Sequence, residues 1–483
     1  MGKQTYDAVI LGAGPSGLTA AYSLAQQGAR ALVVERASQP GGLMRGIRRG
    51  AFSLDLGRKD LHPDRFPEVH ALWTQLLGED YVAHPRRIGM LYGGRILEEK
   101  SGPQGRLRGL SPWQALNVAA GALWAQIQPG PREARSLAEY YRLTYGEPYY
   151  EYFTRGFRHK FDGRDPVEQP APRGAGEIPR FALLRDRLAK RRASRPDTAT
   201  RKRAGSHHPA YGTQQIVDAL WRGAAAGGVE FAFDAEAVAL DASGGRVRTV
   251  TIRQSGVERT LAAGCAIVGV PAPIVMKMMQ PAPPAQLRTP PPEDKAPRKS
   301  TALVYLLAEG EPRFGHNWLE VTDPALRMAR VVNYARWGGR MVPPGKTALC
   351  IEFFSSEGDE LMALERDALL ELAVSEAAAS GLIERARIFD HLVLQLPLAN
   401  ATARHGDWRT AWMVQARSHL CAVQGLLETN RPGMDRACLA GLDAAAACVS
   451  GRAMSERSLE EVDDPHTWRP RPGVRIQGYA YGG

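Results

Sequence analysis

The chain has 483 residues, of which 44% are hydrophobic and 23% are charged. This composition excludes a disordered or fibrous protein, and the length predicts two or three domains with a large core. The 62 Lys and Arg residues exceed the 51 Asp and Glu residues, so the net charge is +11. Residues 180–203, the basic insert, hold ten basic and two acidic residues, a balance of +8. We therefore do not expect a nucleic-acid-binding surface spread along the chain.

Cysteine usage and hydropathy restrict the class further. The five cysteines are scattered and form neither a CxxC pair nor a cluster with zinc spacing, so we expect reduced thiols, no metal site and a cytoplasmic protein. The first residues lack the pattern of a signal peptide. No apolar run reaches the ~20 residues of a membrane span.

The N-terminal region predicts a dinucleotide-binding unit. A short apolar strand over residues 7–11 leads into a glycine-rich loop at 12–17, a helix at 18–25 and a second strand at 31–34. The glycines allow a tight turn and close approach of a pyrophosphate, and the acid after the second strand can accept hydrogen bonds from a ribose. The residues expected to bind the cofactor here are Gly12, Gly14, Pro15, Ser16, Gly17, Glu35 and Arg36.

A second glycine pair follows at residues 41–45 (GGLMR), and residues 55–57 (DLG) come after a predicted hairpin. These motifs and their spacing resemble the flavin amine oxidase superfamily, which includes protoporphyrinogen oxidase-like proteins, carotenoid-type desaturases and UDP-galactopyranose mutases. The resemblance implies FAD as the cofactor, with the pyrophosphate beside residues 41–45 and the isoalloxazine facing the turn at residue 57. The residues that it adds to the cofactor site are Gly41, Gly42, Leu43, Arg45 and Gly57.

The resemblance extends along most of the chain. It includes residues 66–73, 158–163, 208–216 and 266–271, and a helix start at residues 433–441 that lies beside the flavin pyrimidine in the family. A helix N-terminus at that place would stabilise negative charge on the flavin. The resemblance thereby adds four residues to the FAD site, namely Val238, Gly433, Met434 and Asp435.

Two segments in the middle of the chain leave alternatives open. Residues 116–127 (LNVAAGALWAQI) predict a core or subdomain helix, with an amphipathic helix lying on a membrane as the alternative. The basic insert predicts a surface helix followed by a loop. It could act as a lid, an anion funnel or a peripheral membrane contact, or be a solvated basic face.

Several positions depart from the family pattern. Lys59 replaces the histidine that faces the flavin, Leu303 replaces the lysine of amine oxidases, and residues 424–426 (QGL) replace a C-terminal Gly-Asp or Gly-Arg pair. The last departure implies loss of a charged contact to the cofactor. The expected catalytic residues are Arg58, Lys59 and His62, and the expected substrate-binding residues are Asn333 and Arg336.

These features predict an α/β fold in which a Rossmann-type FAD-binding domain, like that of glutathione reductase or p-hydroxybenzoate hydroxylase, is interleaved with an α+β substrate domain. The predicted FAD-binding domain combines residues 1–100, 206–280 and 396–455. The predicted substrate domain combines residues 101–205, as a helical insertion, and 298–395, and a polar tail follows at 456–483.

The function expected from the resemblance is an FAD-dependent oxidoreductase that oxidises a small organic substrate by hydride transfer, in a biosynthetic pathway. Arg58 and Lys59 would suit a substrate with an anionic group. One alternative is a flavin enzyme without net redox chemistry, similar to UDP-galactopyranose mutase. The other is a flavin-fold binding protein without catalysis. The sequence does not indicate the oligomeric state.

Overall fold

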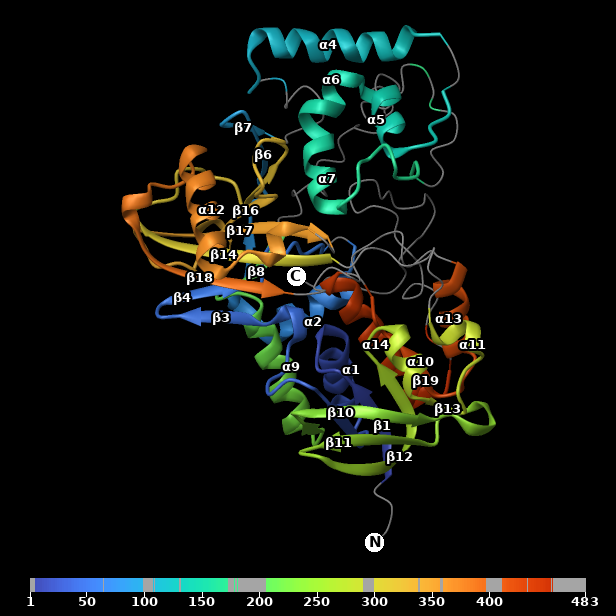
Figure 1. Ribbon diagram of the computed structural model, residues 1–483. Helices are drawn as coiled ribbons and strands as arrows, with labels where there is room; N and C mark the ends of the chain where they lie inside the picture. Colours follow the sequence, from blue (N-terminus) through green and yellow to red (C-terminus); the bar gives the residue numbers. More distant parts are fainter. Residues whose placement is uncertain are drawn as a thin grey trace, which may run out of the picture.

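The computed structural model describes residues 5–98, 109–129, 132–172, 206–289, 299–396 and 411–452, apart from 64, 338, 357, 358 and 432, together with 107, 178, 180 and 454. The predicted tail and all of the basic insert except Arg180 lie outside these residues. The described chain forms two large sheets joined by helices (Figure 1).

The first sheet, eight-stranded over the described residues, combines segments from the start, middle and end of the chain. Its order is β13-β10-β11-β12-β1-β2-β9, and β19 also pairs with β12. Strands β2, β1, β12 and β19 run parallel. The strands are β1 (Thr5–Leu11), β2 (Ala31–Val34), β9 (Glu230–Ala232), β10 (Ala235–Asp241), β11 (Thr249–Gln254), β12 (Val257–Val268), β13 (Met279–Gln280) and β19 (Leu426–Glu428).

Strand β1 is apolar because both of its faces are covered. Ala8 and Ile10 pack with one group of helices, whereas Val9 and Leu11 belong to the core on the other face. Side chains alternate across a strand, so a central strand needs a continuous apolar run. The first face is covered by α1 (Pro15–Gln26), α2 (Pro67–Leu77), α9 (Gln214–Ala226) and α14 (Met434–Ser450).

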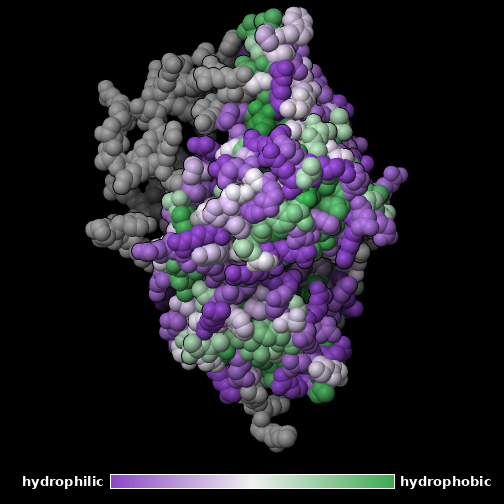
Figure 2. All heavy atoms as spheres, turned by 90° about the vertical axis from the view of Figure 1, so that its left-hand side faces the viewer, coloured by the Kyte–Doolittle hydropathy of each residue, from purple (hydrophilic) through white to green (hydrophobic). Residues whose placement is uncertain are grey.

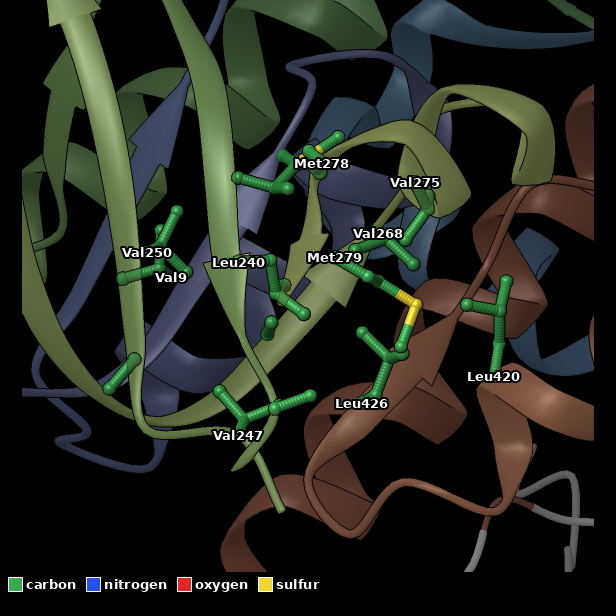
Figure 3. Packing of buried hydrophobic residues seen from close by; sticks show 14 of the residues in the cluster. Val9, Leu240, Val247, Val250, Val268, Val275, Met278, Met279, Leu420 and Leu426 are labelled. Atoms are coloured by element: carbon green, nitrogen blue, oxygen red, sulfur yellow. The ribbon is translucent and has the colours of Figure 1, made fainter. Parts of the chain in front are cut away.

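The opposite face of the first sheet packs on a second apolar core (Figure 3). In this core Leu240 and Val250 of the antiparallel strands meet Val268 of β12 and Leu426 of β19. The helices on this side are α10 (Ala272–Met278), α11 (Ala285–Arg288) and α13 (Ala411–Cys421). The two layers of helices confirm the predicted Rossmann-type sheet.

The second sheet is mixed, and its order is β18-β14-β17-β16-β15-β6-β7 over the described residues. One face packs on α12 (Arg366–Ala379), and the other faces the FAD-binding half through Phe52 and Leu54. Its strands are β6 (Ile88–Tyr92), β7 (Arg95–Glu98), β14 (Lys299–Glu309), β15 (Trp318–Val321), β16 (Arg330–Asn333), β17 (Lys346–Ser356) and β18 (Ile388–Leu396).

Two small sheets connect the halves, one formed by β3 (Gly46–Arg49) and β4 (Phe52–Asp55), the other by β5 (Tyr81–His84) and β8 (Ser206–Pro209). A helical unit lies above the second sheet in Figure 1. It contains α4 (Pro112–Ile127), α5 (Leu137–Tyr145), α6 (Glu147–Tyr150), a π-helical turn (Glu151–Arg155) and α7 (Gly156–Asp162).

The domain boundaries stay a prediction. Strands β6 and β7 fall before residue 100, within the predicted FAD-binding domain, yet they hydrogen-bond in the second sheet, where β6 runs parallel to β15. No helix among the described residues is long and apolar enough to cross a membrane.

Candidate functional site

The first glycine-rich loop turns tightly between β1 and α1. Gly12 has φ +98°, a left-handed conformation that favours glycine. A Cβ on Gly17 would lie 1.9 Å from the carbonyl oxygen of Gly12, so glycine is needed for the close contact of helix and loop. A Cβ on Gly14 would meet no heavy atom within 4 Å. The N-terminus of α1 is therefore open to a ligand at Gly14, where helix amides favour a phosphate.

The second glycine pair packs directly on the first loop. The amide of Gly41 donates to the carbonyl oxygen of Ala13 at 2.7 Å, and a Cβ on Gly42 would lie 3.2 Å from the Cα of Gly14. Arg45 donates from Nε to the carbonyl oxygen of Gly42 at 3.1 Å, which holds its guanidinium at the same loop. The structure thus brings the two predicted loops together into one backbone cradle with a cation beside it.

The acid after β2 is held by the loops around it. Oε2 of Glu35 accepts from the amide of Ala13 at 2.7 Å, and Oε1 accepts from the amide of Ala37 at 2.8 Å. Each carboxylate oxygen can accept a further hydrogen bond. Glu35 is therefore oriented at the loop in the way that recognition of a ribose requires.

The remaining residues predicted around this half of the cofactor lie less deep. Val238 is half-buried on β10, three residues after Ala235, whose amide donates to the carbonyl oxygen of Glu35 at 3.0 Å. Arg36 and Leu43 are exposed. The contact of all three residues with a cofactor stays a prediction.

Three parallel strands end at the same edge as the cradle. Gly12 follows β1, Gly269 follows β12 and Thr429 follows β19. A Cβ on Gly269 would lie 2.9 Å from Oγ of Ser16 and 3.7 Å from Oγ1 of Thr429. Ligands of open α/β sheets bind at the carboxyl ends of the strands, so this edge is the expected place for a dinucleotide.

A buried charge cluster at this edge was not found by sequence reasoning. Glu428, the last residue of β19, accepts hydrogen bonds through Oε2 from Arg417 and Arg431. The sequence offered one signal for this cluster, namely an acidic residue at the end of a short apolar strand. Residues 424–426, where the resemblance implies a lost charged contact, lie instead at the amino end of β19, because the carbonyl of Gly425 accepts from Ala266. Charged side chains thus follow the strand at the cofactor edge.

Helix α14 begins directly after Gly433, which has φ +84°, as the sequence predicts. In its first turn Oδ1 of Asp435 accepts from the amide of His62 at 3.3 Å and lies 2.7 Å from Nε2 of His70. The hydroxyl of Tyr81 contacts the other ring nitrogen of His70. Asp435 therefore links the helix N-terminus to the segment that holds the predicted catalytic residues.

The turn at Gly57 is held by hydroxyl groups from the second sheet. Gly57 has φ +68°. The hydroxyls of Tyr305 and Tyr334 donate to the carbonyl oxygen of Asp55 at 2.8 and 2.7 Å, and Tyr334 also donates to that of Gly57 at 3.1 Å. Burial raises the pKa of both phenols well above the usual value, so both remain donors. The second sheet thereby sets the position of the turn.

A buried carboxylate lies beneath the turn. Glu352 accepts from the amide of Arg58 at 2.5 Å and from Nη1 of Arg330 at 2.7 Å. A Cβ on Gly57 would lie 2.7 Å from Oε1 of Glu352 and 3.4 Å from Cδ2 of Leu303. Leu303, which stands where amine oxidases have a lysine according to the resemblance, therefore lies next to the turn and gives it an apolar neighbour.

The predicted catalytic cations lie directly after the turn. Nζ of Lys59 donates to the carbonyl oxygen of Leu56 at 2.7 Å, and burial lowers the pKa of this amine against the opposing effect of Asp55. The guanidinium of Arg58 lies 4.9 Å from the ring centroid of Trp318. Both cations are half-buried rather than solvated, which strengthens their electrostatic effect on a nearby anion.

Asp60 is the counterion of this segment. Its Oδ2 lies 3.3 Å from Nη1 of Arg58, 2.8 Å from Nη2 of Arg86 and 3.7 Å from Nε2 of His62. Burial opposes ionisation, but the hydrogen bond from Arg86 and the charge of Arg58 hold the pKa of Asp60 well below its usual range. Burial also lowers the pKa of His62. The structure thus joins two of the three predicted catalytic residues, Arg58 and His62, through one carboxylate.

The proposed substrate side of the site lies on the second sheet. The guanidinium of Arg330 pairs with Glu352 and lies 5.2 Å from the ring centroid of Phe354 and 5.7 Å from that of Phe157. Its Nε is buried and has no hydrogen-bond partner within the described part of the chain. Arg330 was not among the residues predicted to bind substrate, although it precedes the predicted Asn333 on the same strand, β16.

The two residues predicted to bind substrate lie at the end of β16 and just after it, and their contact with substrate stays a prediction. Asn333 is fully buried, and its side chain accepts from the amide of Ala335 at 3.2 Å and donates to the carbonyl oxygen of Phe314 at 3.0 Å. These contacts favour a role in fixing the end of β16. Arg336 is exposed. The structure brings neither side chain to the turn at Gly57 through a described contact.

A cavity of about 690 Å³ opens between α7 and the end of the second sheet. Phe354 lines it and also contacts Arg330, so the cavity adjoins the Arg330–Glu352 pair. Its charged lining residues include Arg155 and Lys160, and burial lowers the pKa of Lys160 to about 8. No group of three or more metal-ligating side chains was found among the residues that the structure describes.

The residues at the first sheet fit the adenosine and pyrophosphate of a dinucleotide. The space beside Gly14, the oriented carboxylate of Glu35 and the guanidinium of Arg45 supply the backbone approach, the ribose acceptor and the phosphate counterion. The turn at Gly57 and the N-terminus of α14 then stand where the resemblance places the flavin ring.

Comparison with known proteins supports this assignment of the fold. Residues 10–76 match the model of an NAD(P)-binding Rossmann-like domain. Over 78 residues the chain is 44% identical to the all-trans-zeta-carotene desaturase of Myxococcus xanthus, and this match covers 15% of each chain. The chain spans less than a sixth of the length of the curated relatives that it matches.

Solved structures extend the likeness to the whole chain. A reduced UDP-galactopyranose mutase superposes with a TM-score of 0.76 at 19% identity, covering 94% of this chain and 97% of that one. A protein assigned as a protoporphyrinogen oxidase from Exiguobacterium sp. 255-15 superposes with a TM-score of 0.67 at 16% identity, covering 93% and 98%. At these identities the likeness concerns the fold. The chain therefore shares the fold of these two proteins, as its sequence resemblance predicts.

Proposed function

We propose that the protein is an FAD-dependent oxidoreductase that oxidises a small organic substrate. The observation that supports this most directly is the open backbone at Gly14, enclosed by the second glycine pair and faced by the fixed carboxylate of Glu35. FAD bound there would supply the hydride acceptor. The protein would contribute the binding, the orientation and the electrostatics.

We propose an anionic group on the substrate. The backbone amide of Arg58 and the guanidinium of Arg330 both donate to Glu352 at the turn of Gly57, and the Nε of Arg330 is a buried donor. A carboxylate or phosphate is the acceptor that such a planar donor recognises best. Leu303 beside the same turn disfavours a substrate amine held in the manner of amine oxidases.

A second candidate is a non-redox flavin enzyme similar to UDP-galactopyranose mutase. The mutase superposes well on this chain, and His62, at the position of the second histidine of the mutases, is held between Asp60 and Asp435. The third alternative, binding without catalysis, predicts that flavin is present but that no substrate changes its spectrum.

The first test is the cofactor itself. We expect the purified protein to be yellow and to release FAD on denaturation. Gly14→Val places a side chain in the open space and should abolish flavin binding while the protein stays folded. Gln26→Val, at the exposed far end of α1, is the matched control and should keep its flavin. Full flavin occupancy in Gly14→Val would contradict the assignment of the loop.

The second test separates the candidate reactions. An anaerobic screen of carboxylate- and phosphate-bearing alcohols, cyclic imines and nucleotide sugars should reveal a substrate that bleaches the flavin. A mutase would instead turn over nucleotide sugars only after prior reduction of the flavin. Flavin that is bound but unaffected under both conditions would support binding without catalysis.

We also propose a cytoplasmic location. All five cysteines, which the structure describes, are free thiols. Free thiols are typical of a reducing compartment. Fractionation of cells that express the protein, followed by thiol labelling, would test this location.

A further inference from the structure

Two of the five cysteines meet where α14 packs on the first sheet. Cys265 lies on β12, where it pairs with Ala8 of β1, and Cys448 lies in the last turn of α14. Sγ of Cys265 lies 4.0 Å from the carbonyl oxygen of Cys448, and the two thiols are hydrogen-bonded to each other. The fold thus brings together two sulfurs that are 183 positions apart in the sequence.

The backbone packs closely around this thiol pair. Sγ of Cys448 lies 3.7 Å from the carbonyl oxygen of Asp7 on β1. A Cβ on Gly264 would lie 3.0 Å from that same oxygen, and a Cβ on Gly425 would lie 3.6 Å from Cα of Cys265. A side chain at either glycine would therefore press on the backbone that holds the pair.

Both thiols can be reached from water. Cys265 and Cys448 are half-buried, whereas Cys350 and Cys438 are completely shielded. In Figure 1 strand β12 lies at the lower end of the molecule, and Figure 2 shows hydrophilic side chains over much of that end. The pair therefore combines contact between two sulfurs with access for a small reagent in water, such as a peroxide.

The two thiols differ in how readily they lose a proton. The hydrogen bond from Cys448 lowers the pKa of Cys265, against the effects of burial and of the charge of Asp7. The same hydrogen bond and burial raise the pKa of Cys448. The thiolate is the form that attacks a peroxide. Cys265 is therefore suited to attack, and Cys448 to react with the oxidised sulfur.

We propose that Cys265 and Cys448 form a reversible disulfide when the protein meets a peroxide. The thiolate of Cys265 attacks one oxygen of hydrogen peroxide, the O–O bond breaks, and the other oxygen leaves as water with the proton of the thiol. Cys265 is then a sulfenic acid. The sulfur of Cys448 attacks the sulfenic sulfur, and its proton leaves with the hydroxyl group as a second water. The two thiols thus supply the two electrons that reduce the peroxide.

The disulfide would tie the end of α14 to the first sheet. A bond that joins residues so distant in the sequence restricts the unfolded chain and stabilises the folded one. The first turn of the same helix contacts the amide of His62 through Asp435. Transient disulfides in reducing compartments serve catalysis or redox sensing. The pair would therefore secure this helix under oxidative conditions, and this proposal does not depend on the proposed function.

The test is treatment of the reduced, full-length flavoprotein with a small excess of hydrogen peroxide, followed by thiol titration after denaturation. We expect two of the five thiols to disappear, the mass to fall by two hydrogens, and dithiothreitol to restore both thiols. The temperature of unfolding should rise by a few degrees on oxidation. Cys265→Ser and Cys448→Ser should each abolish the crosslink and this rise.

The controls identify the pair and the role of each thiol. Trypsin leaves Cys438 and Cys448 in one peptide, residues 437–452, so Cys438→Ala is the matched control and should keep the crosslink. Cys421→Ser, at an exposed thiol, should keep it as well. Dimedone, which traps sulfenic acids, should label Cys265 in the Cys448→Ser variant but should not label Cys448 in the Cys265→Ser variant.

Several results would overturn the proposal. Wild-type protein that keeps all five thiols, or a crosslink that persists in Cys448→Ser, would do so. So would a disulfide between two copies of the chain through Cys421 that leaves the pair reduced. Dimedone labelling of Cys448 but not of Cys265 would refute the assignment of the attacking thiol. Circular dichroism confirms that each variant is folded, independently of its flavin content.

Discussion

The carboxylate of Asp55 lies 2.9 Å from Nε2 of His208, and both side chains are almost wholly shielded from water. Oδ1 of Asp55 accepts from the amide and the hydroxyl of Thr213 at 2.7 and 2.8 Å. Burial opposes its ionisation, but the charge of His208 and its hydrogen bond lower the pKa of Asp55. The backbone carbonyl of Asp55 also accepts hydrogen bonds from the hydroxyls of Tyr305 and Tyr334. Asp55 therefore anchors the turn at Gly57.

Asp55→Ala should therefore destabilise the protein strongly. Removing one partner of a buried ionic pair leaves the other uncompensated, which costs about 3–5 kcal/mol. Urea unfolding of the flavin-loaded protein would measure the loss. Asp390→Ala removes the exposed pair with Arg49 and should cost less than about 1 kcal/mol. Equal effects of the two variants would contradict the anchoring role.

His84 should make stability depend on pH. Burial, aided by His208, lowers the pKa of His84 to about 4, whereas an unfolded histidine titrates near 6.5. Between pH 4 and pH 6.5 the imidazole of residue 84 takes up a proton only in the unfolded chain. The contribution of His84 to the free energy of unfolding is therefore complete above pH 6.5 and is lost as the pH falls toward 4. The loss amounts to about 3 kcal/mol at most.

Unfolding at pH 7 and pH 5 would measure this contribution. His84→Gln should flatten the pH dependence of the free energy of unfolding over that interval. His391→Gln, at an exposed histidine, should leave the dependence unchanged. A wild-type profile that is already flat between pH 7 and 5 would show that His84 is protonated in the folded protein.

Gly441 limits how closely α14 can approach α1. A Cβ at this position would lie 2.3 Å from the carbonyl oxygen of Ser16. Gly441→Ala should therefore move the two helices apart and destabilise the protein by about 1–3 kcal/mol, with weaker flavin binding because both helix N-termini face the cofactor edge. Ala446→Leu, at an exposed position of α14, is the control. Calorimetry and flavin titration would show whether both losses occur together.

Lys59 should influence the flavin if it faces it as the resemblance implies. A half-buried cation stabilises negative charge on its neighbour, so Lys59→Met is expected to lower the two-electron midpoint potential by about 30 mV or more, equal to about 1.4 kcal/mol. Lys277→Met, which makes the same change at an exposed lysine, is the matched control and should leave the potential unchanged. Identical potentials for wild type and Lys59→Met would place Lys59 away from the flavin ring.

Much of the first sheet could be predicted because its determinants are local. The strand–loop–helix–strand order around Gly12, Gly14 and Gly17 follows from the spacing of glycines and apolar residues, and the helix start at Gly433 follows from the motif. Conformation at these positions depends on residues that are close in the sequence.

The contacts that shape the turn at Gly57 could not be predicted in this way. Glu352 meets Arg58 across 294 residues, and His208 meets Asp55 from another sheet. Asn333 was expected to bind substrate from the resemblance alone, and the hydrogen bonds of its side chain with the backbone of Phe314 and Ala335 could not be predicted. Pairing between distant segments leaves no periodic signal in the sequence.

The order of the strands in the first sheet has a consequence for synthesis of the protein on the ribosome. The cofactor edge joins β1, which is made first, to β12 and to β19, which ends at Glu428, and α14 then packs on α1. A nascent chain lacks this edge until β19 and α14 have been translated. We therefore expect FAD to bind only after these segments are made, and the apolar edge of β12 to be prone to aggregation until then.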